Sequence, residues 1–292
     1  MGPVSAASSP ARAGGPLPRA LRGVREALAD PRPFDPYRLD RRDPELVADL
    51  LPLFEWIAQR YLRLEVEGLD HVPMGPALFV ANHNGGILGP DLFCTLSTLW
   101  RRHGPDRPLY AMAHDLAMRR VTPLGRVLQK VGAMRAHPAN AARSLAEGHG
   151  VLVYPGGDLD AYRPFWRRDQ VVFGRRTGFA RVARDARVPI VPVVAHGAHR
   201  SALIFHEGRW LARALGLTRW SRVQSFPLAL ALPWGIGAGP WVPYLPLPFP
   251  IRLRVLEPID PSPTADPRQT GAEVVGRMQR ALDEMARRGA PR

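Results

Sequence analysis

One histidine stands where a reactive side chain could be held rigidly and still reach a substrate. His83 follows the apolar run 77–81 and precedes a glycine-rich loop, in the stretch FVANHNGGILGPD (79–91). A strand end is rigid and the loop after it is exposed, and α/β folds place reactive groups there. Because imidazole exchanges a proton near neutral pH, His83 is a candidate general base.

The neighbours of His83 suggest how such a base would work. Gly85 and Gly86 allow close approach of a substrate, and their amides are candidate oxyanion donors. Asp91 could orient the imidazole, as carboxylates do in other base–orienter pairs. The sequence GPD (89–91) is also typical of a helix start, with proline at the first helical position and an acid in the first turn. Both interpretations of Asp91 stay open.

The elements that would position His83 alternate between helix and strand. Apolar residues recur at three- and four-residue spacing from Leu46 to Tyr61, which predicts an amphipathic helix over 43–64. The interleaving predicts an α/β class. The two prolines in VPIVPVVAHG (188–197) suggest a sheet edge or a strand end. The expected strands are 64–68, 77–81, 109–113, 151–157, 188–197 and 251–260, and the other expected helices are 91–102, 123–131, 177–186 and 270–287.

Composition limits the class of protein. The net charge of +14 indicates anionic partners. Cys94 is the only cysteine, which excludes an internal disulfide and a cysteine-built zinc site. His196 and His199 lie three apart, but no third ligand is evident nearby, so no metal site is expected.

The chain divides into one large domain and two terminal segments. Residues 1–40 are expected to be a disordered basic tail, and they lack the apolar core of a secretory signal, so secretion is not expected. Residues 41–265 are expected to form the catalytic domain, and 266–292 a C-terminal helix packed on it.

A stretch late in the chain is apolar enough for a membrane. No charged residue occurs from Val223 to Ile251, but seven prolines disfavour a spanning helix. The stretch reads as an irregular apolar loop whose Trp234, Trp241 and Tyr244 suit the headgroup level of a bilayer. A loop packed on the domain's own core is the alternative that stays open.

Four motifs carry a family resemblance. ANHNGGILGPD (81–91), GAMR (132–135), YPGGD (154–158) and VPIVPVVAHG (188–197) resemble the four ordered blocks of the phospholipid/glycerol acyltransferase family, over roughly residues 45–260. The glycine loop and the Tyr-Pro-Gly-Gly block are similar to the bacterial branch related to mono- and diacylglycerol acyltransferases. The resemblance implies a mixed sheet flanked by helices.

The resemblance also implies a reaction. His83 would deprotonate an acceptor hydroxyl, which attacks an acyl thioester on coenzyme A or acyl carrier protein, with no metal, cofactor or covalent acyl-enzyme. Arg135 would contact the acceptor, and Pro192 would help to shape an acyl groove. The substrate-binding residues implied are Asn82, Gly85, Gly86, Arg135, Pro155, Gly156, Gly157, Asp158 and Pro192.

The chain departs from the family pattern at two motifs. The usual His-x4-Asp spacing would put the acid at Leu88, whereas the first acid is Asp91, which can serve only if the glycine loop folds back. The third block lacks the usual glutamate and the arginine that follows it, which weakens the case for a glycerol-phosphate acceptor. Arg163, Arg167 and Arg168 follow that block; they could contact a substrate phosphate, or they could form a solvated face.

Rival functions are less well supported. The chain has no G-x-S-x-G for a serine hydrolase, and GIGAGP (235–240) lacks the dinucleotide-binding spacing. A basic module for anionic lipid or nucleic acid, and a catalytically silent lipid-binding relative, remain as alternatives. The sequence predicts an O-acyltransferase at the cytoplasmic face of a membrane, with membrane lipids and a thioester carrier as partners and no nucleic acid.

Overall fold

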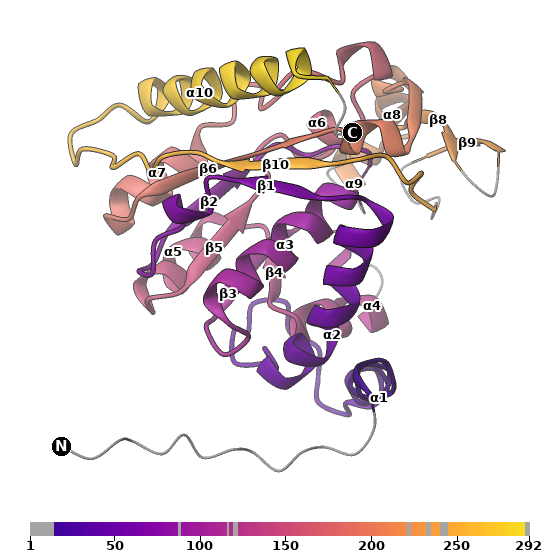
Figure 1. Cartoon of the computed structure of the whole chain (residues 1–292), viewed down its shortest axis with the longest axis vertical. Helices are drawn as coiled ribbons and strands as arrows, with labels where there is room; N and C mark the ends of the chain where they lie inside the picture. The colour runs from indigo at the N-terminus through magenta and orange to yellow at the C-terminus, as the bar shows by residue number, and fades with distance from the viewer. Residues whose placement is uncertain are drawn as a thin grey trace.

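A computed structural model describes residues 15–86, 89–115, 117–118, 122–220, 223–231, 235–239 and 245–289 (Figure 1). Its centre is a seven-stranded mixed sheet with the strand order β1-β10-β6-β2-β5-β3-β4. Strands β6, β2, β5, β3 and β4 run parallel to one another, while β10 runs antiparallel to β6. The strands of this sheet are β1 (Glu65–Glu67), β2 (Leu78–Ala81), β3 (Leu109–Ala113), β4 (Ala133–Arg135), β5 (Gly150–Val153), β6 (Ile190–His196) and β10 (Arg252–Val255).

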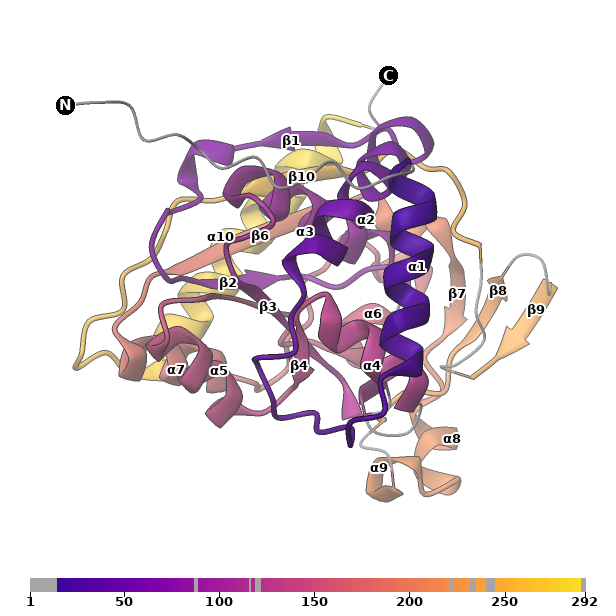
Figure 2. The same ribbon diagram turned by 90° about the horizontal axis from the view of Figure 1, so that it is seen from below.

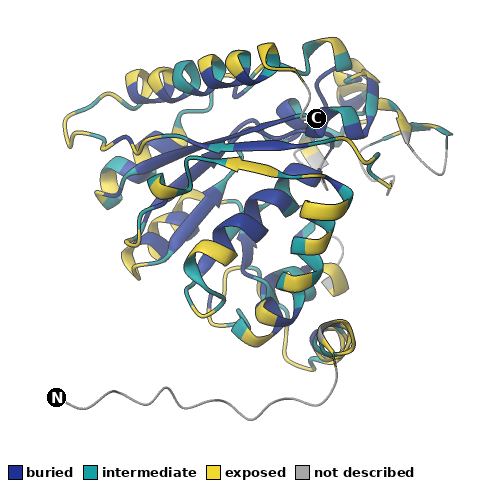
Figure 3. Ribbon diagram, viewed as in Figure 1, coloured by how far each residue is buried: buried dark blue, intermediate teal, exposed yellow. Residues whose placement is uncertain are grey.

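Helices cover both faces of the sheet, so the expected α/β class with a mixed sheet flanked by helices is confirmed. Figure 1 shows α3 and α10 on opposite sides of the sheet. Figure 3 shows the sheet, apart from its edge strand β1, buried between helices whose outer surfaces are exposed. The helices are α1 (Pro16–Ala29), α2 (Pro44–Trp56), α3 (Pro90–His103), α4 (Thr122–Lys130), α5 (Pro138–Ala146), α6 (Asp158–Ala161), α7 (Gly178–Ala186), α8 (Arg209–Ala214), α9 (Leu217–Trp220) and α10 (Pro267–Arg287).

Each face of the sheet has its own apolar core. Alternate residues of a strand point to opposite faces, so Phe79 packs with α2 and α3, while Leu78 and Val80 pack with α5, α7 and α10. The helix expected over 270–287 is α10, which packs on β6 and α7. Helices therefore pack on both faces of β2, and β5 and β6 pair with its two edges. His83 follows this buried strand in the sequence.

The expectation of a disordered tail over residues 1–40 is wrong for residues 16–29, which form α1; residues 1–14 lie outside the described residues. Pro16 stands at the start of the helix, where its missing N–H costs nothing. Ala20 and Ala27 are buried, and α1 packs against α2 and α4. Small alanines let the helices approach closely, and composition alone did not reveal that contact.

Neither Pro189 nor Pro192 marks a sheet edge, because β6 lies between β10 and β2, but Pro189 directly precedes β6 and so marks a strand end, as the other interpretation predicts. Pro192 pairs with Val80 of β2 and precedes Val193, the first residue of β6 that pairs with β10. The carbonyl of Pro192 accepts the N–H of Leu256. Because the N and the carbonyl of a strand residue face the same neighbour, the missing N–H of Pro192 faces β10 outside the residues paired with it, which is why a central strand tolerates the proline.

The apolar stretch 223–251 is not wholly irregular. It contains β8 (Leu228–Ala231) and β9 (Gly235–Ala238), which join β7 (Leu203–His206) in a small antiparallel sheet, so the loop expected there is wrong over these residues. Trp234, Trp241 and Tyr244 lie outside the described residues. No helix in the described part of the chain is long and apolar enough to cross a bilayer.

Candidate active site

The loop after β2 folds back and brings His83 against Asp91. His83 Nδ1 lies 2.9 Å from Asp91 Oδ2, and the N–H of Asn84 donates to the same oxygen at 3.2 Å. Gly85 and Gly86 adopt φ values of +74° and +91°, a region that side chains disfavour, and so they permit this reversal. The eight-residue spacing, which differs from the family pattern, therefore still allows the base and the acid to pair.

The electrostatic environment keeps His83 titratable despite its burial. Burial by itself lowers the pKa of an imidazole, but the charge of Asp91 and its hydrogen bond raise it, as does Asp160. The net result is a pKa for His83 above its ordinary value. A carboxylate on Nδ1 fixes the tautomer that carries its proton there, which leaves Nε2 as the acceptor.

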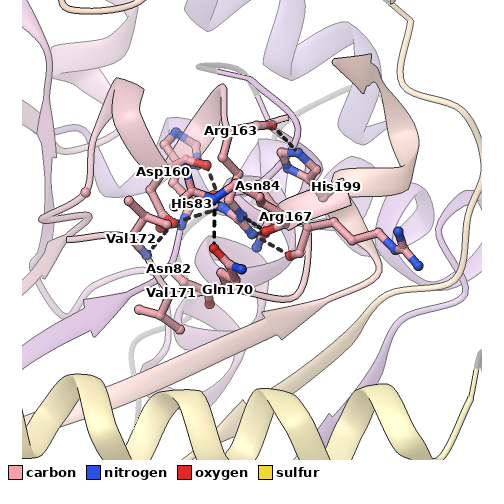
Figure 4. Close-up of polar contacts among 12 residues, drawn as sticks. Asn82, His83, Asn84, Asp160, Arg163, Arg167, Gln170, Val171, Val172 and His199 are labelled. Atoms are coloured by element: carbon pink, nitrogen blue, oxygen red, sulfur yellow. Dashed lines mark hydrogen bonds and ion pairs between the residues drawn. The ribbon is translucent and has the colours of Figure 1, made fainter. Parts of the chain in front are cut away.

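A second buried ion pair clamps the main chain at His83. Asp160 Oδ2 accepts the N–H of His83 at 2.6 Å, and Asp160 Oδ1 accepts the N–H of Val172 at 2.9 Å. Arg163 Nη1 donates to the carbonyl of His83 at 2.7 Å and to Asp160 Oδ1 at 2.9 Å. Both polar groups of the His83 main chain are thus held by one pair. Figure 4 shows Asp160 and Arg163 gathered around His83 and Asn84.

His199 supports the other side of the same loop. Its Nδ1 accepts the N–H of Gly85 at 3.1 Å, and its Nε2 donates to the carbonyl of Arg163 at 2.7 Å. Burial and the charge of Arg163 lower the pKa of His199 to about 3. His199 therefore stays neutral and acts as a hydrogen-bonding strut.

Asn82 binds a neighbouring strand. Its side chain accepts the N–H of Ala195 at 2.8 Å and donates to the carbonyl of Ala195 at 3.0 Å. Asn84 donates to the same carbonyl at 3.1 Å, and its other side-chain atom accepts from Arg163. Asn82 is fully buried and does not line the cavity. These contacts tie the loop to β6, and the substrate contact expected for Asn82 remains a prediction.

The amides of Gly85 and Gly86 are not available as oxyanion donors. The N–H of Gly85 is bound by His199, and the N–H of Gly86 donates to the carbonyl of Ala161 at 2.9 Å. Neither glycine lines the cavity. The expected role is therefore wrong, because the loop uses these two amides to hold its own shape.

The Tyr-Pro-Gly-Gly-Asp block borders His83 on its remaining side. The rings of Tyr154 and His83 have their centroids 4.6 Å apart. Pro155, Gly157 and Asp158 line the cavity, as Tyr154 does. Gly156 does not line the cavity. It packs against Asp160 so closely that there is no room for a Cβ. Of this block, three of the four predicted binding residues can meet a substrate.

A cavity of about 680 Å³ opens at His83. Its walls come from β3, the carboxyl end of β5, the first residues of β2 and β4, and from α3, α4, α5, α7, α8 and α9. Its polar and charged lining residues are His83, His114, Asp115, His137, Asp158, Arg176, Arg209, Arg213, Thr218 and Gln224. The remaining lining is mostly apolar, so the cavity suits an amphipathic ligand.

The remaining predicted residues lie away from this cavity. Arg135 binds Asp115 through its Nε at 2.6 Å and lies over the Tyr37 ring, and it does not line the cavity, although Asp115 does. Pro192 is buried within β6 and does not line it either. The contacts expected for these two residues therefore remain predictions.

The arginines after the third block differ in their placement. Arg163 is fully buried in the clamp, so neither a solvated face nor a forked contact to substrate phosphate describes it. Arg167 and Arg168 bind Gln170 and Asp169 near the surface. Sequence reasoning missed Asp160, and the one available signal was its three-residue spacing from Arg163.

No group of metal-ligating side chains occurs among the residues that the structure describes. His196 and His199 do not converge. His196 Nε2 lies 3.5 Å from Asp169 Oδ1, whereas both nitrogens of His199 bind the main chain.

Comparison with known proteins agrees with the sequence motifs. Residues 63–196, which include His83, Asp91, Asp160 and Arg163, match the Acyltransferase family model. They form an acyltransferase domain of the phospholipid/glycerol acyltransferase family. The resemblance carried by the four motifs is thus confirmed.

Relatives of this domain occur in bacteria and animals. The chain is 31% identical to an uncharacterized protein of Mycobacterium tuberculosis over 223 residues, which are 76% of this chain and 58% of that protein. It is 26% identical to the mouse DGAT1/2-independent enzyme synthesizing storage lipids, over 76% of this chain and 59% of that enzyme. The chain therefore spans somewhat more than half the length of these relatives.

A solved structure shares the fold of the acyltransferase domain. The crystal structure of the 1-acyl-sn-glycerophosphate acyltransferase PlsC from Thermotoga maritima aligns with a TM-score of 0.51 over 82% of each chain. The sequences are 17% identical, so this likeness concerns the fold alone.

Proposed function

We propose that the protein is an O-acyltransferase that moves a fatty acyl group from a thioester to the hydroxyl of a glycerolipid or another lipid. The observation that carries the proposal is the buried His83–Asp91 pair, which lies at a largely apolar cavity inside the acyltransferase domain. A relative named for the synthesis of storage lipids supports a lipid acceptor.

In the proposed reaction, His83 Nε2 takes the proton of the acceptor hydroxyl as its oxygen attacks the thioester carbonyl carbon. Asp91 stabilises the imidazolium that forms. The tetrahedral intermediate then collapses, the carbon–sulfur bond breaks, and the thiolate takes the proton back from His83. An ester and a free thiol result, and the chemistry needs no resident metal or cofactor.

The donor in this proposal is acyl-CoA or acyl carrier protein. Both carry a phosphate on the pantetheine arm, and Arg209 and Arg213 line the cavity. Guanidinium groups bind phosphate through paired donors, so these two residues are suited to hold the arm of either carrier.

The proposal also includes peripheral binding to the cytoplasmic leaflet of a membrane. Helix α8 and the β7–β9 sheet extend from the body of the protein (Figure 2). Their exposed apolar side chains are Phe205, Trp210, Leu215, Leu228, Leu230 and Ile236. Between residues 203 and 249 the sequence has four arginines and a single acid, Glu207. Exposed aromatic and apolar side chains in a segment rich in arginine suit binding to an anionic leaflet.

The test measures thiol release from two donors in parallel, palmitoyl-CoA and palmitoyl-acyl carrier protein. The acceptors are monoacylglycerol, diacylglycerol or lysophospholipid in vesicles, and glycerol 3-phosphate in solution. We expect acceptor-dependent release, and we expect His83→Ala to reduce it by at least about a hundredfold. Thermal unfolding confirms that the variant is folded. No release with any donor and acceptor, from protein that still binds vesicles, would instead support a silent lipid-binding relative.

Vesicle sedimentation in the same assay tests the membrane part. Trp210→Asp places a charge on α8, and Met74→Asp is the matched control, since Met74 is 57% exposed and lies before β2, at the opposite end of that strand from His83. We expect only Trp210→Asp to weaken sedimentation with anionic vesicles. Equal behaviour of the two variants would remove α8 from the proposal.

A further inference from the structure

The cavity at His83 reaches both faces of the central sheet. Ala111 and Met112 are consecutive residues of β3, so their side chains point to opposite faces, and both line the cavity. The same holds for Val153 and Tyr154 at the end of β5. The cavity therefore passes around the carboxyl ends of these strands and divides into two arms.

The arm on the α3 side begins beside the base. Leu92 follows Asp91, the partner of His83, and Leu92, Leu96, Ala111 and Val131 belong to the apolar core on this face. Ala133 pairs with Ala111 on the neighbouring strand and so shares its face. We call this the α3 arm; it is lined by Leu92, Leu96, Ala111, Leu128, Val131 and Ala133.

The arm on the other face is equally apolar. Its residues belong to or pack against the core between the sheet and α5, α7 and α10. Leu78, the first residue of β2, lines it, so the arm follows the strand back from the level of His83. We call this the α7 arm; it is lined by Leu78, Met112, Ala141, Val153, Phe179 and Val182.

The twelve residues named for the two arms are apolar, whereas the charged side chains of the lining, Asp115, Asp158, Arg176, Arg209 and Arg213, lie outside the arms. Asp158 and Arg176, whose oxygen and nitrogen are 3.8 Å apart, border the α7 arm, since Gly178 and Phe179 of α7 also line the cavity. A single acyl donor would fill one arm. The second arm would then hold water against apolar walls, which is unfavourable.

We infer that the two arms bind two hydrocarbon chains at once, the acyl chain of the donor in the α3 arm and a chain of the acceptor in the α7 arm. The acceptor is then itself a lipid, such as a monoacylglycerol, a lysolipid or a long-chain alcohol. The acyl chain of the donor is itself wholly apolar and must start at the base, which suits the α3 arm with its apolar entrance at Leu92, while the polar carrier stays outside that arm. An acceptor headgroup has polar atoms, which suit Asp158 and Arg176. The inference rests on the proposed acyl transfer.

A matched pair of substitutions tests the inference. Val182→Phe narrows the α7 arm and Val131→Phe narrows the α3 arm, and both valines are half-buried at the cavity wall. We expect Val182→Phe to lower kcat/KM by about tenfold for a palmitoyl acceptor relative to an octanoyl acceptor, with the donor-length profile unchanged, because each methylene that loses its place forfeits transfer free energy. Val131→Phe should instead lower kcat/KM for a palmitoyl donor relative to an octanoyl donor and leave the acceptor-length profile unchanged. Met112→Ala, which widens the α7 arm, should favour longer acceptors.

The possible outcomes separate the inference from the proposed function. A wild-type protein that transfers no acyl group refutes the proposed function itself. If the wild type is active but Val182→Phe changes the donor profile, or changes neither profile, the two-arm assignment is refuted while acyl transfer stands. Activity with the short acceptor shows that each variant is folded, and Met112→Ala decides the case if Val182→Phe does not fold.

Discussion

The loop after β2 is supported by two histidines whose surroundings have opposite effects. On one side, His83 faces the carboxylate of Asp91, and its pKa is raised in spite of burial. On the other side, His199 faces the main chain and the nearby charge of Arg163, and its pKa falls to about 3. Burial alone lowers the pKa of an imidazole, and an adjacent carboxylate raises it. Only the His83 side can exchange a proton during a reaction.

The two carboxylates show the same contrast. Both oxygens of Asp160 are bound, by main-chain N–H groups and by Arg163. Asp91 Oδ1 has no hydrogen-bond partner among the described residues, so its charge is balanced mainly through His83. A fully satisfied pair fixes geometry, whereas the charge of Asp91 and its hydrogen bond raise the pKa of His83. We therefore treat Asp160 and Arg163 as positioning residues and His83 and Asp91 as reacting ones.

The largest effect on stability should come from breaking the clamp. Arg163→Met leaves Asp160 buried without its counter-charge and the carbonyl of His83 without a donor. We expect a loss of about 3–5 kcal/mol in the free energy of unfolding, measured by urea denaturation. Arg277→Met is the control, because its pair with Glu273 is exposed and should contribute less than about 1 kcal/mol.

A double-variant cycle sharpens this prediction. If the clamp acts as a pair, Asp160→Asn and Arg163→Met together should cost clearly less than the sum of their separate effects. Additive effects would show that the two residues support the loop independently.

The second prediction concerns activity. Asp91→Asn should reduce kcat by about a hundredfold or more, because the imidazolium loses its stabilising charge and the tautomer is no longer fixed. His83 is inactive when protonated, and its raised pKa places the acidic limb of the wild-type pH profile above the ordinary range. Without Asp91 that pKa falls, so the limb should move to lower pH. A limb that does not move would assign the titration to another group.

The sequence could predict those parts of the site that depend on local patterns, but not the contacts between residues far apart in the chain. His83 and the Tyr-Pro-Gly-Gly-Asp block were recognisable because a strand end, a glycine loop and a family motif are local patterns. Asp160 and Arg163 contact His83 across 77 and 80 residues, and nothing in their own segment indicates that partner. The same limit explains the error over Gly85, whose amide is bound by His199 from 114 residues away.

The fold shows a similar division. The strands and amphipathic helices of the central domain follow from periodicity, and the α/β class was predicted correctly. Helix α1 was missed because its buried residues, Ala20 and Ala27, are small and only weakly apolar, so the helix depends on the surface of α2 and α4 that it covers. The β8–β9 hairpin was missed because prolines dominate the flanking sequence.

The smallest expected effect is that of His199→Gln. A glutamine amide can accept from Gly85 and donate to the carbonyl of Arg163, as the neutral imidazole does. We expect kcat to change by no more than about threefold and the acidic limb to stay in place, since a group with a pKa of about 3 does not titrate in that range. His199→Ala, which leaves both main-chain groups unpaired, should cost about 1–3 kcal/mol of stability. If His199→Gln shifts the limb instead, both histidines take part in the proton exchange, and the division between a reacting side and a supporting side of the loop fails.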